Sequence, residues 1–365
     1  MELDRILSAA MAVGVVLGGA DRILGGRMGL GKQFEKGFLL LGPMALSMAG
    51  MICLAPVLAD ALGRGVVPLC RLMGVDPAMF GSLLAIDMGG YQLAKELEAD
   101  PLIGSYAGLV VSSVFGCTLV FTIPVGMGVL PKDERPLFAR GVMLGLAAMP
   151  VGLIGGGLAS GLTPLACIRQ NIPIFVLALL LFLGLRRAPE RMVEGFCALA
   201  GGIKAAVTAG LVLAAVEALT GWCPVAGMAP LREAMSTVAS IGIVMLGSLP
   251  LADLLCRGLA RPLGWLGGRV GLGPTGLGGM LVGLVTPLPT LSMYPEMDRR
   301  EKVAAGAFLV SGASLLAAHM GFVVSVEPEM LLPLMAGKLG GALAAAGLAL
   351  WLERGEPGQS RSDRT

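Results

Sequence analysis

Residues 102–130 read LIGSYAGLVVSSVFGCTLVFTIPVGMGVL, a run without a single charged side chain. About 20 predominantly apolar residues are enough for a helix to cross the hydrocarbon core of a bilayer, which is about 30 Å thick. The run also carries Gly, Ser and Ala, which let membrane helices approach one another closely. This stretch therefore predicts a membrane-spanning helix, and similar stretches recur along the chain.

The composition of the whole chain agrees with this prediction. Of its 365 residues, 55% are hydrophobic and only 14% are charged, and the mean hydropathy is +0.82. A soluble domain averages about 25% charged residues. The net charge of +2 is too small for a nucleic-acid-binding surface. We therefore expect an all-α polytopic membrane protein, because a helix satisfies its own backbone hydrogen bonds in lipid.

Eleven apolar segments are expected to be embedded in the membrane. Two of them, 78–94 and 276–295, are interrupted by Gly, Pro or a charge and are expected to be broken or re-entrant. The other nine are expected to span, at 3–20, 37–62, 102–130, 137–163, 172–186, 197–218, 236–256, 303–326 and 331–352. Residues 1–352 would form a single transmembrane transport domain, and residues 353–365 a disordered cytoplasmic tail.

The distribution of Lys and Arg predicts the orientation. If both interrupted segments enter and leave on one side, 19 Lys and Arg residues fall in the cytoplasmic regions, at 21–36, 131–140, 186–194, 257–269, 296–302 and the tail. Six fall outside, in the N-terminus and at 63–77, 91–101, 164–171, 219–235 and 327–330, and Lys204 and Lys338 lie within spans. This bias follows the positive-inside rule, whereas two further full crossings would invert it locally. We expect a multi-pass protein of the bacterial cytoplasmic (inner) membrane, with the N-terminus outside and the C-terminus inside. No cleavage-site pattern follows the first apolar stretch, so no signal peptide is expected.

A weak internal repeat accompanies the two interrupted segments. The sequence LAPVLAD at 54–60 resembles SLPLAD at 248–253, and each copy leads into one interrupted segment. We place repeat A at about 37–130 and repeat B at about 236–326, in inverted orientation. Inverted repeats with interrupted helices are typical of secondary transporters, and the breaks mark the substrate site.

The sequence AIDMGGYQLAKELE at 85–98 contains the sharpest candidate site. A carboxylate inside an apolar segment is costly, so Asp87 is interpreted as functional. The same residue would also suit the cap of a half-helix that begins at Met88. Gly89 and Gly90 would free backbone carbonyls beside it, and Tyr91 would offer a cation–π face. Carbonyls together with one carboxylate form a socket for a small cation.

Four other polar residues are candidates. His319 lies within an apolar span and can titrate near neutral pH, although hydrogen-bonded packing is the alternative. Lys338 is similarly embedded and is expected to act at a gate, to pair with a carboxylate or to snorkel. Lys95 and Glu96 suit either a gate or a local ion-pair cluster.

The sequence predicts no metal, disulfide framework or cofactor, because the Cys residues are scattered, only one His is present and no Walker A motif occurs.

Several of these stretches match a known family. They are QFEKGF at 33–38, MALSMAGM at 44–51, DMGG at 87–90, LAKEL at 93–97, HMGF at 319–322 and GKL at 337–339. Together they resemble the ethanolamine permeases of bacterial ethanolamine-utilisation operons, over nearly the whole chain. The resemblance implies an inner-membrane carrier that supplies ethanolamine to a cobalamin-dependent lyase housed in a microcompartment.

The chain departs from the family pattern at two places. Thr286-Pro287-Leu288-Pro289 stands where the family has an Asn-Asn-Ile-Pro type sequence, and Ala318 stands where it has an acidic residue before the His. Both changes remove polar groups from the half of the site that repeat B would contribute. A related small amine or alcohol is therefore left open as the cargo.

We expect a secondary transporter that imports ethanolamine, whose amine is protonated at neutral pH because alkylamines have a pKa of about 10. Asp87 and the carbonyls at Gly89 and Gly90 would hold the ammonium group. Thr286 and Thr290 would hydrogen-bond the hydroxyl group of the solute.

Two further side chains complete the expected mechanism, in which one repeat rocks against the other. Tyr91 would close over the methylene groups, and His319 would respond to protons. The alternatives are a carrier of another small amine or alcohol and a channel-like facilitator. An intramembrane enzyme is not expected, because no convincing acid–base pair occurs in the spans. The expected partners are the solute and the lipid bilayer, without nucleic acid, and the sequence leaves homo-oligomerisation open.

Overall fold

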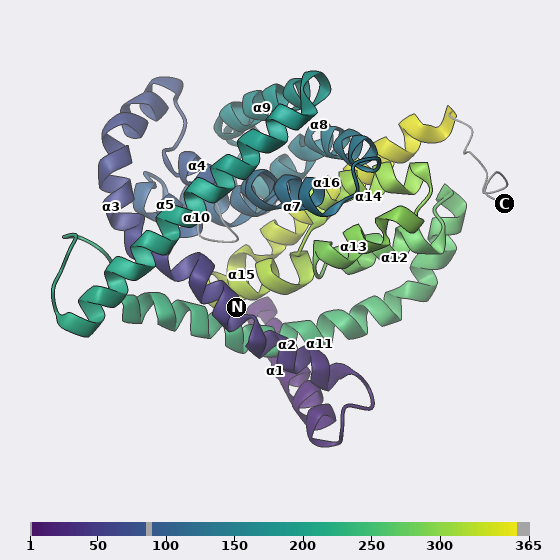
Figure 1. The fold of residues 1–365 in the computed structure, drawn as a ribbon, viewed down its shortest axis with the longest axis horizontal. Coiled ribbons are helices and arrows are strands. Elements are labelled where there is room, and N and C mark those ends of the chain that lie inside the picture. Colours follow the sequence, from purple (N-terminus) through teal and green to yellow (C-terminus); the bar gives the residue numbers. More distant parts are fainter. Residues whose placement is uncertain (1, 85–89, 356–365) are drawn as a thin grey trace.

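The structure, a computed structural model, describes residues 2–84 and 90–355, and these residues form helices and connecting turns without a β-strand (Figure 1). Eight helical stretches are long and apolar enough to span a membrane: Leu30–Met73, Pro101–Val129, Arg135–Ala159, Pro164–Arg187, Pro189–Thr220, Leu231–Leu259, Arg299–Val326 and Pro328–Leu352. They correspond to eight of the nine expected spans. Residues 3–20 lie in α1 (Glu2–Ile23), which is not among the eight. The chain is thus an all-α multi-pass membrane protein, while eleven embedded segments are not confirmed.

The helices follow one another with short connections. After α1, the first half consists of α2 (Leu30–Leu39), α3 (Leu41–Met73), α4 (Ala78–Gly81), η1 (Ser82–Leu84), α5 (Gly90–Leu97), α6 (Pro101–Ser105), the π-helices η2 (Tyr106–Gly116) and η3 (Thr118–Thr122), and α7 (Ile123–Val129). Three long helices then follow, α8 (Arg135–Ala159), α9 (Pro164–Arg187) and α10 (Pro189–Thr220). The second half consists of α11 (Leu231–Val270), α12 (Pro274–Gly283), α13 (Pro287–Met293), η4 (Tyr294–Glu296), α14 (Arg299–Gly312), the π-helix η5 (Leu315–His319), α15 (Met320–Val326), η6 (Pro328–Met330), α16 (Leu331–Leu352) and η7 (Glu353–Gly355).

The same order of elements recurs in the two expected repeats. Both α3 and α11 are long helices with two internal Pro residues, and each ends at a Gly in the left-handed conformation, Gly74 (φ 65°) and Gly271 (φ 75°). Glycine is favoured at this position because it has no Cβ to clash. Each long helix leads to short helices on both sides of an interruption, α4–η1 and α5 in one copy, α12 and α13 in the other. This order supports the prediction of a repeat, while its inversion stays a prediction.

The ion pairs bring together loops that were assigned to the cytoplasmic side. Lys302 pairs with Glu134, which joins the loop at 296–302 to the loop at 131–140. Glu353 pairs with Arg140 (2.6 Å) and Arg299 (3.6 Å). Glu353 was expected to begin a disordered tail, but it is only 3% exposed and belongs to the folded bundle. Two arginines and a helix end enclose it, and residues 356–365 of the expected tail lie outside the described residues.

The loops that were assigned to the outside also contact one another. The Asp76 backbone N–H donates to the side-chain oxygen of Gln170 (2.7 Å), and its carboxylate accepts from the N–H of Asp100 (3.0 Å). Lys95 lies 3.5 Å from the Glu327 carboxylate. These contacts agree with the predicted grouping of the loops, while the side that each group faces stays a prediction.

The expected span at 303–326 corresponds to the candidate span Arg299–Val326, but two helical pieces rather than one continuous helix form it. α14 ends at Gly312, and η5 begins at Leu315. Between them Ser314 adopts the left-handed conformation (φ 58°), which is uncommon for a residue other than Gly and is a source of backbone strain. The apolar run continues through this point without a Pro or a charge, so hydropathy alone does not reveal the break.

Close packing through glycine holds α8, α14 and α16 together (Figure 1). A Cβ atom at Gly152 of α8 would overlap the carbonyl oxygen of Gly337 in α16, and one at Gly141 would lie 2.6 Å from the carbonyl oxygen of Val303 in α14. Small residues at such contacts let the two backbones come into direct van der Waals contact. Gly155, on the same helix, has only ordinary contacts at the position of a Cβ, 3.8 Å from the nearest atom.

We predict that Gly152→Ala lowers the thermal unfolding midpoint of the detergent-purified protein, because overpacking costs about 1–3 kcal/mol. The matched control is Gly155→Ala, which adds the same methyl group to the same helix and should leave the midpoint unchanged or slightly raised. Equal midpoints for the two variants would contradict the close contact between α8 and α16.

Candidate functional site

Two interruptions in the second half meet through their backbones. Pro287 begins α13 after Thr286, whose backbone is extended (φ −159°, ψ 137°), so α12 and α13 are separate helices. The N–H of Ser314 donates to the carbonyl of Gly283 (3.0 Å), and the N–H of Leu316 donates to the carbonyl of Leu284 (2.8 Å). Irregular backbone at membrane depth is tolerated only where it is buried in protein or lines a cavity. The two breaks satisfy this condition by bonding to each other.

The two threonines of this region differ in their surroundings. Thr290 is fully buried, and its hydroxyl donates to the carbonyl of Gly279 (2.6 Å), which ties α13 to α12. Thr286 is half-buried, and its side chain makes no capping hydrogen bond at the start of α13. Of the two, Thr286 is therefore the one with a hydroxyl that can donate to a solute.

His319 lies at the end of η5, one turn after the break. Its backbone N–H donates to the carbonyl of Ser314 (3.2 Å), which joins it to the irregular segment. The side chain is 2% exposed, and its Nδ1 has no hydrogen-bond partner among the described residues. A buried polar atom without a partner costs about 1–3 kcal/mol, so this nitrogen is a functional candidate.

Lys338 lies in α16 and is fully buried. Its Nζ donates to the backbone carbonyl of Ser113 in η2 (2.8 Å), rather than to a carboxylate or at the surface. η2 thus contributes a backbone oxygen to this buried polar region, and π-helical turns often occur at functional sites.

The elements on both sides of the first interruption, η1 and α5, contact the same π-helix. Asp87 and Gly89 fall outside the described residues, and η1 and the buried Gly90, which begins α5, flank them. A Cβ atom at Gly108 of η2 would lie 2.9 Å from the Cα of Tyr91, so α5 rests directly on η2. η1 and α5, which flank the Asp87 segment, and the ammonium group of Lys338 therefore all contact η2.

Tyr91 does not lie free for a cation–π contact. Its hydroxyl donates to Glu327 (2.8 Å), and its ring packs edge-on against Phe322 at a centroid distance of 5.5 Å.

Lys95, one turn further along α5, pairs with Glu98 (2.7 Å) and contacts Glu327, whereas Glu96 is exposed. Sequence reasoning missed Glu327. Its signal was a carboxylate directly after an apolar span and before a proline.

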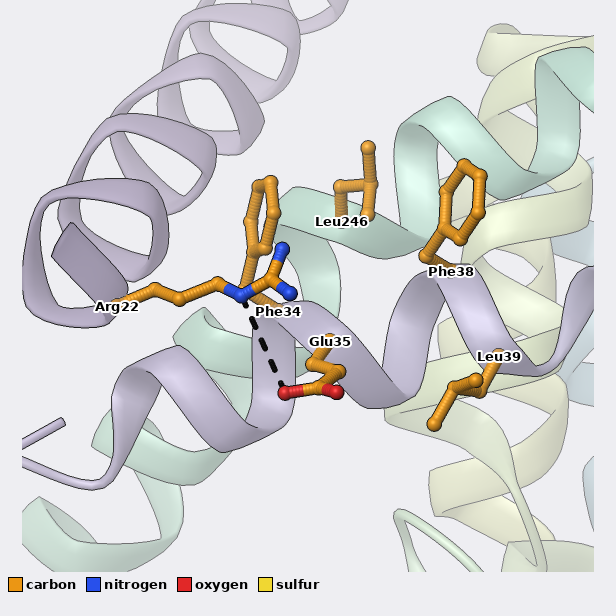
Figure 2. Close-up of a pocket in the computed structure, with 6 residues that line it drawn as sticks. All are labelled: Arg22, Phe34, Glu35, Phe38, Leu39 and Leu246. Atoms are coloured by element: carbon orange, nitrogen blue, oxygen red, sulfur yellow. Dashed lines mark ion pairs between the residues drawn. The ribbon is translucent and has the colours of Figure 1, made fainter. Parts of the chain in front are cut away.

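A hollow of about 470 Å³ lies elsewhere, between α1, α2 and α11 (Figure 2). It is lined by Arg22, Phe34, Glu35, Phe38, Leu39 and Leu246. Arg22 and Glu35 are both about half exposed and lie 4.0 Å apart. None of the predicted site residues lines this hollow, and its phenylalanine and leucine side chains suit contact with lipid. It is therefore not the candidate site.

Within the described residues, no group of three or more His, Cys, Asp and Glu side chains is placed to hold a metal ion. The seven cysteines all lie among the described residues and form no disulfide with one another, and four of them are buried as small apolar side chains.

Comparison with known proteins identifies the family. The family model described as "Ethanolamine utilisation protein, EutH" matches residues 3–352. The chain is 38% identical to the probable ethanolamine permease EutH of Listeria monocytogenes over 353 residues, which cover 96% of this chain and 95% of that protein. It is 38% identical to the probable ethanolamine permease EutH of Escherichia coli over 379 residues (96% and 91%) and 37% identical to the uncharacterized protein YxeR of Bacillus subtilis over 345 residues (94% and 93%). No solved structure gives a significant match. The chain therefore belongs to the EutH family of ethanolamine utilisation proteins, a family of permeases rather than enzymes.

Proposed function

We propose that this protein is a secondary transporter that imports ethanolamine across the cytoplasmic membrane. The observation that carries the proposal is the pair of interruptions at 284–286 and 313–314, which bond to each other inside a membrane-spanning bundle. Interrupted helices at membrane depth are the sites where secondary transporters bind their solutes. The relatives from Listeria monocytogenes and Escherichia coli are named as probable ethanolamine permeases, and these names support ethanolamine as the solute.

In this proposal the ammonium group of ethanolamine binds Asp87 and the carbonyls at Gly89 and Gly90. A carboxylate in an apolar segment gives a charge-assisted hydrogen bond to a primary ammonium group, which is stronger than a bond between neutral groups. The position of α5 on η2 supports this assignment, because α5 begins at Gly90 and η2 carries the Ser113 carbonyl that accepts from Lys338.

The hydroxyl end of the solute is assigned to repeat B. Thr286 supplies the hydrogen bond, and Thr290 contributes its remaining acceptor capacity while it donates to Gly279. His319 offers an unpartnered Nδ1 in the same half of the molecule and is the proton-responsive group of the proposal. Tyr91 would turn from Glu327 to the methylene groups as the site closes.

A carrier of this kind alternates between two orientations of the repeats, whereas a channel-like facilitator does not. We predict that proteoliposomes preloaded with unlabelled ethanolamine will transiently accumulate labelled ethanolamine above its equilibrium level. The uptake rate should also saturate with concentration. A flux that rises linearly with concentration and shows no counterflow would contradict the carrier and favour the facilitator.

We predict that Asp87→Asn reduces ethanolamine uptake at least tenfold, because a neutral amide cannot compensate the charge of the ammonium group. The measurement is the initial rate of uptake of labelled ethanolamine by proteoliposomes that contain equal amounts of folded protein. Asp133→Asn, in an exposed loop, is the matched control and should keep the wild-type rate. Full activity of Asp87→Asn would show that Asp87 does not bind the ammonium group of ethanolamine.

We predict that Thr286→Val raises the KM for ethanolamine about two- to tenfold, which corresponds to one lost hydrogen bond of about 0.5–1.5 kcal/mol. The same substitution should leave competition by ethylamine unchanged, because ethylamine lacks the hydroxyl group. Thr208→Val, at an exposed position of α10, serves as the control. Equal losses for ethanolamine and ethylamine would place the hydroxyl group of the solute elsewhere.

A further inference from the structure

Four side chains form a second polar site at the end of the bundle that is predicted to face outward. We call Tyr91, Lys95, Glu98 and Glu327 the Lys95 cluster. The Lys95 ammonium group lies 2.7 Å from Glu98 Oε2 and 3.5 Å from Glu327 Oε1. Tyr91 donates its hydroxyl to the same Glu327 oxygen (2.8 Å). The cluster therefore presents one primary ammonium group held between two carboxylates.

The cluster connects parts of the chain that are far apart in sequence. Lys95 and Tyr91 lie on α5, next to the interrupted segment at 85–89, whereas Glu327 lies in the turn between α15 and η6. Gly104 of the following helix α6 leaves the space that the Glu98 side chain occupies, because a Cβ atom at Gly104 would overlap the Glu98 carboxylate. Any movement of α5 relative to α15 has to break the contacts with Glu327.

The charges in the cluster do not balance. Two carboxylates face one ammonium group, and the hydroxyls of Tyr91 and Ser105 are neutral. Burial alone would lower the pKa of Lys95, but Glu98 and Glu327 outweigh burial and hold this pKa above its ordinary value. The side chains of Lys95, Glu98 and Glu327 are 28%, 19% and 16% exposed, so the cluster is partly shielded and still reachable from water.

We propose that the Lys95 cluster is an ammonium-selecting gate, in which the primary ammonium group of the solute replaces Lys95 between Glu98 and Glu327. The ammonium group of Lys95 and that of ethanolamine are the same chemical group, and the lysine group is carried on a flexible four-carbon stem. An exchange of one for the other keeps one ammonium group between the two carboxylates, so neither carboxylate loses its ion-pair partner, a loss that is costly for a buried charge. Displacement of Lys95 also breaks one of the two contacts between α5 and Glu327, and the hydroxyl of Tyr91 makes the other.

This inference rests on the proposed function and deepens it, because it names the chemical class that the gate admits. A primary alkylammonium ion can donate hydrogen bonds to both carboxylates and to the Tyr91 oxygen. A quaternary ammonium ion of similar size has no N–H group to donate. The gate would therefore favour ethanolamine over its N-trimethylated analogue.

The test compares Lys95→Met with Glu327→Gln, by initial rates of labelled ethanolamine uptake in proteoliposomes. A gate in which Lys95 and the solute compete predicts opposite shifts: Lys95→Met lowers the KM severalfold, and Glu327→Gln raises it tenfold or more. A purely structural ion pair predicts that both variants lose activity in the same direction. Glu329→Gln, at an exposed position two residues from Glu327, is the matched control and should match the wild type.

A second measurement covers the case in which Lys95→Met folds poorly. Ethanolamine or methylammonium should raise its thermal unfolding midpoint more than that of the wild type, because the added ammonium group compensates the two carboxylates. Tetramethylammonium should not. Three results would each overturn the gate: KM shifts in the same direction for Lys95→Met and Glu327→Gln, an unchanged KM in both variants, or a raised unfolding midpoint of Lys95→Met with tetramethylammonium. If the wild type still takes up ethanolamine, each of these results leaves the proposed carrier function standing. A wild type without ethanolamine uptake would overturn both proposals.

Discussion

The structure depends on one constraint, the need to satisfy backbone N–H and carbonyl groups inside a lipid bilayer. A continuous helix meets it within its own segment, but an interrupted helix does not. In this protein the break after Gly283 and the break at Ser314 meet it together, through hydrogen bonds from Ser314 to Gly283 and from Leu316 to Leu284. The candidate site follows from this pairing, because it places irregular polar backbone, Thr286 and His319 in one region of an otherwise apolar bundle.

A second constraint is the distance between the helices. The membrane gives no hydrophobic force between helices, so contact between small residues has to supply the stability. Gly152 against Gly337 and Gly141 against Val303 bring α8 into backbone contact with α16 and α14. These contacts fix α16, and with it Lys338, which reaches the carbonyl of Ser113 in η2. Glycine packing in the core thus positions the buried charge.

The sequence allowed the coarse fold to be predicted, because hydropathy and the positions of Lys and Arg report on lipid directly. Pro287 and Pro289 made the break in 276–295 visible, since two closely spaced prolines remove two backbone donors and each kinks or breaks a helix. The break at Ser314 could not be predicted, because it depends on hydrogen bonds to a segment about 30 residues away rather than on a local breaker. Glu327 was missed for the same reason. Its partners Tyr91 and Lys95 come from the other half of the chain, and only the tertiary structure brings them together.

The charges at the two ends of the bundle are arranged in opposite ways. At one end, among the described residues, the carboxylates of Glu134 and Glu353 are matched by Lys302, Arg140 and Arg299, so positive charge is in excess. At the other end, Glu98 and Glu327 share the single ammonium group of Lys95, so positive charge is lacking. Arginine binds carboxylates in a rigid fork, whereas lysine is a mobile point charge that another ammonium group can replace. The first end thus holds its carboxylates with cations of the chain itself, whereas the proposed gate at the second end exchanges the ammonium group of Lys95 for that of the solute.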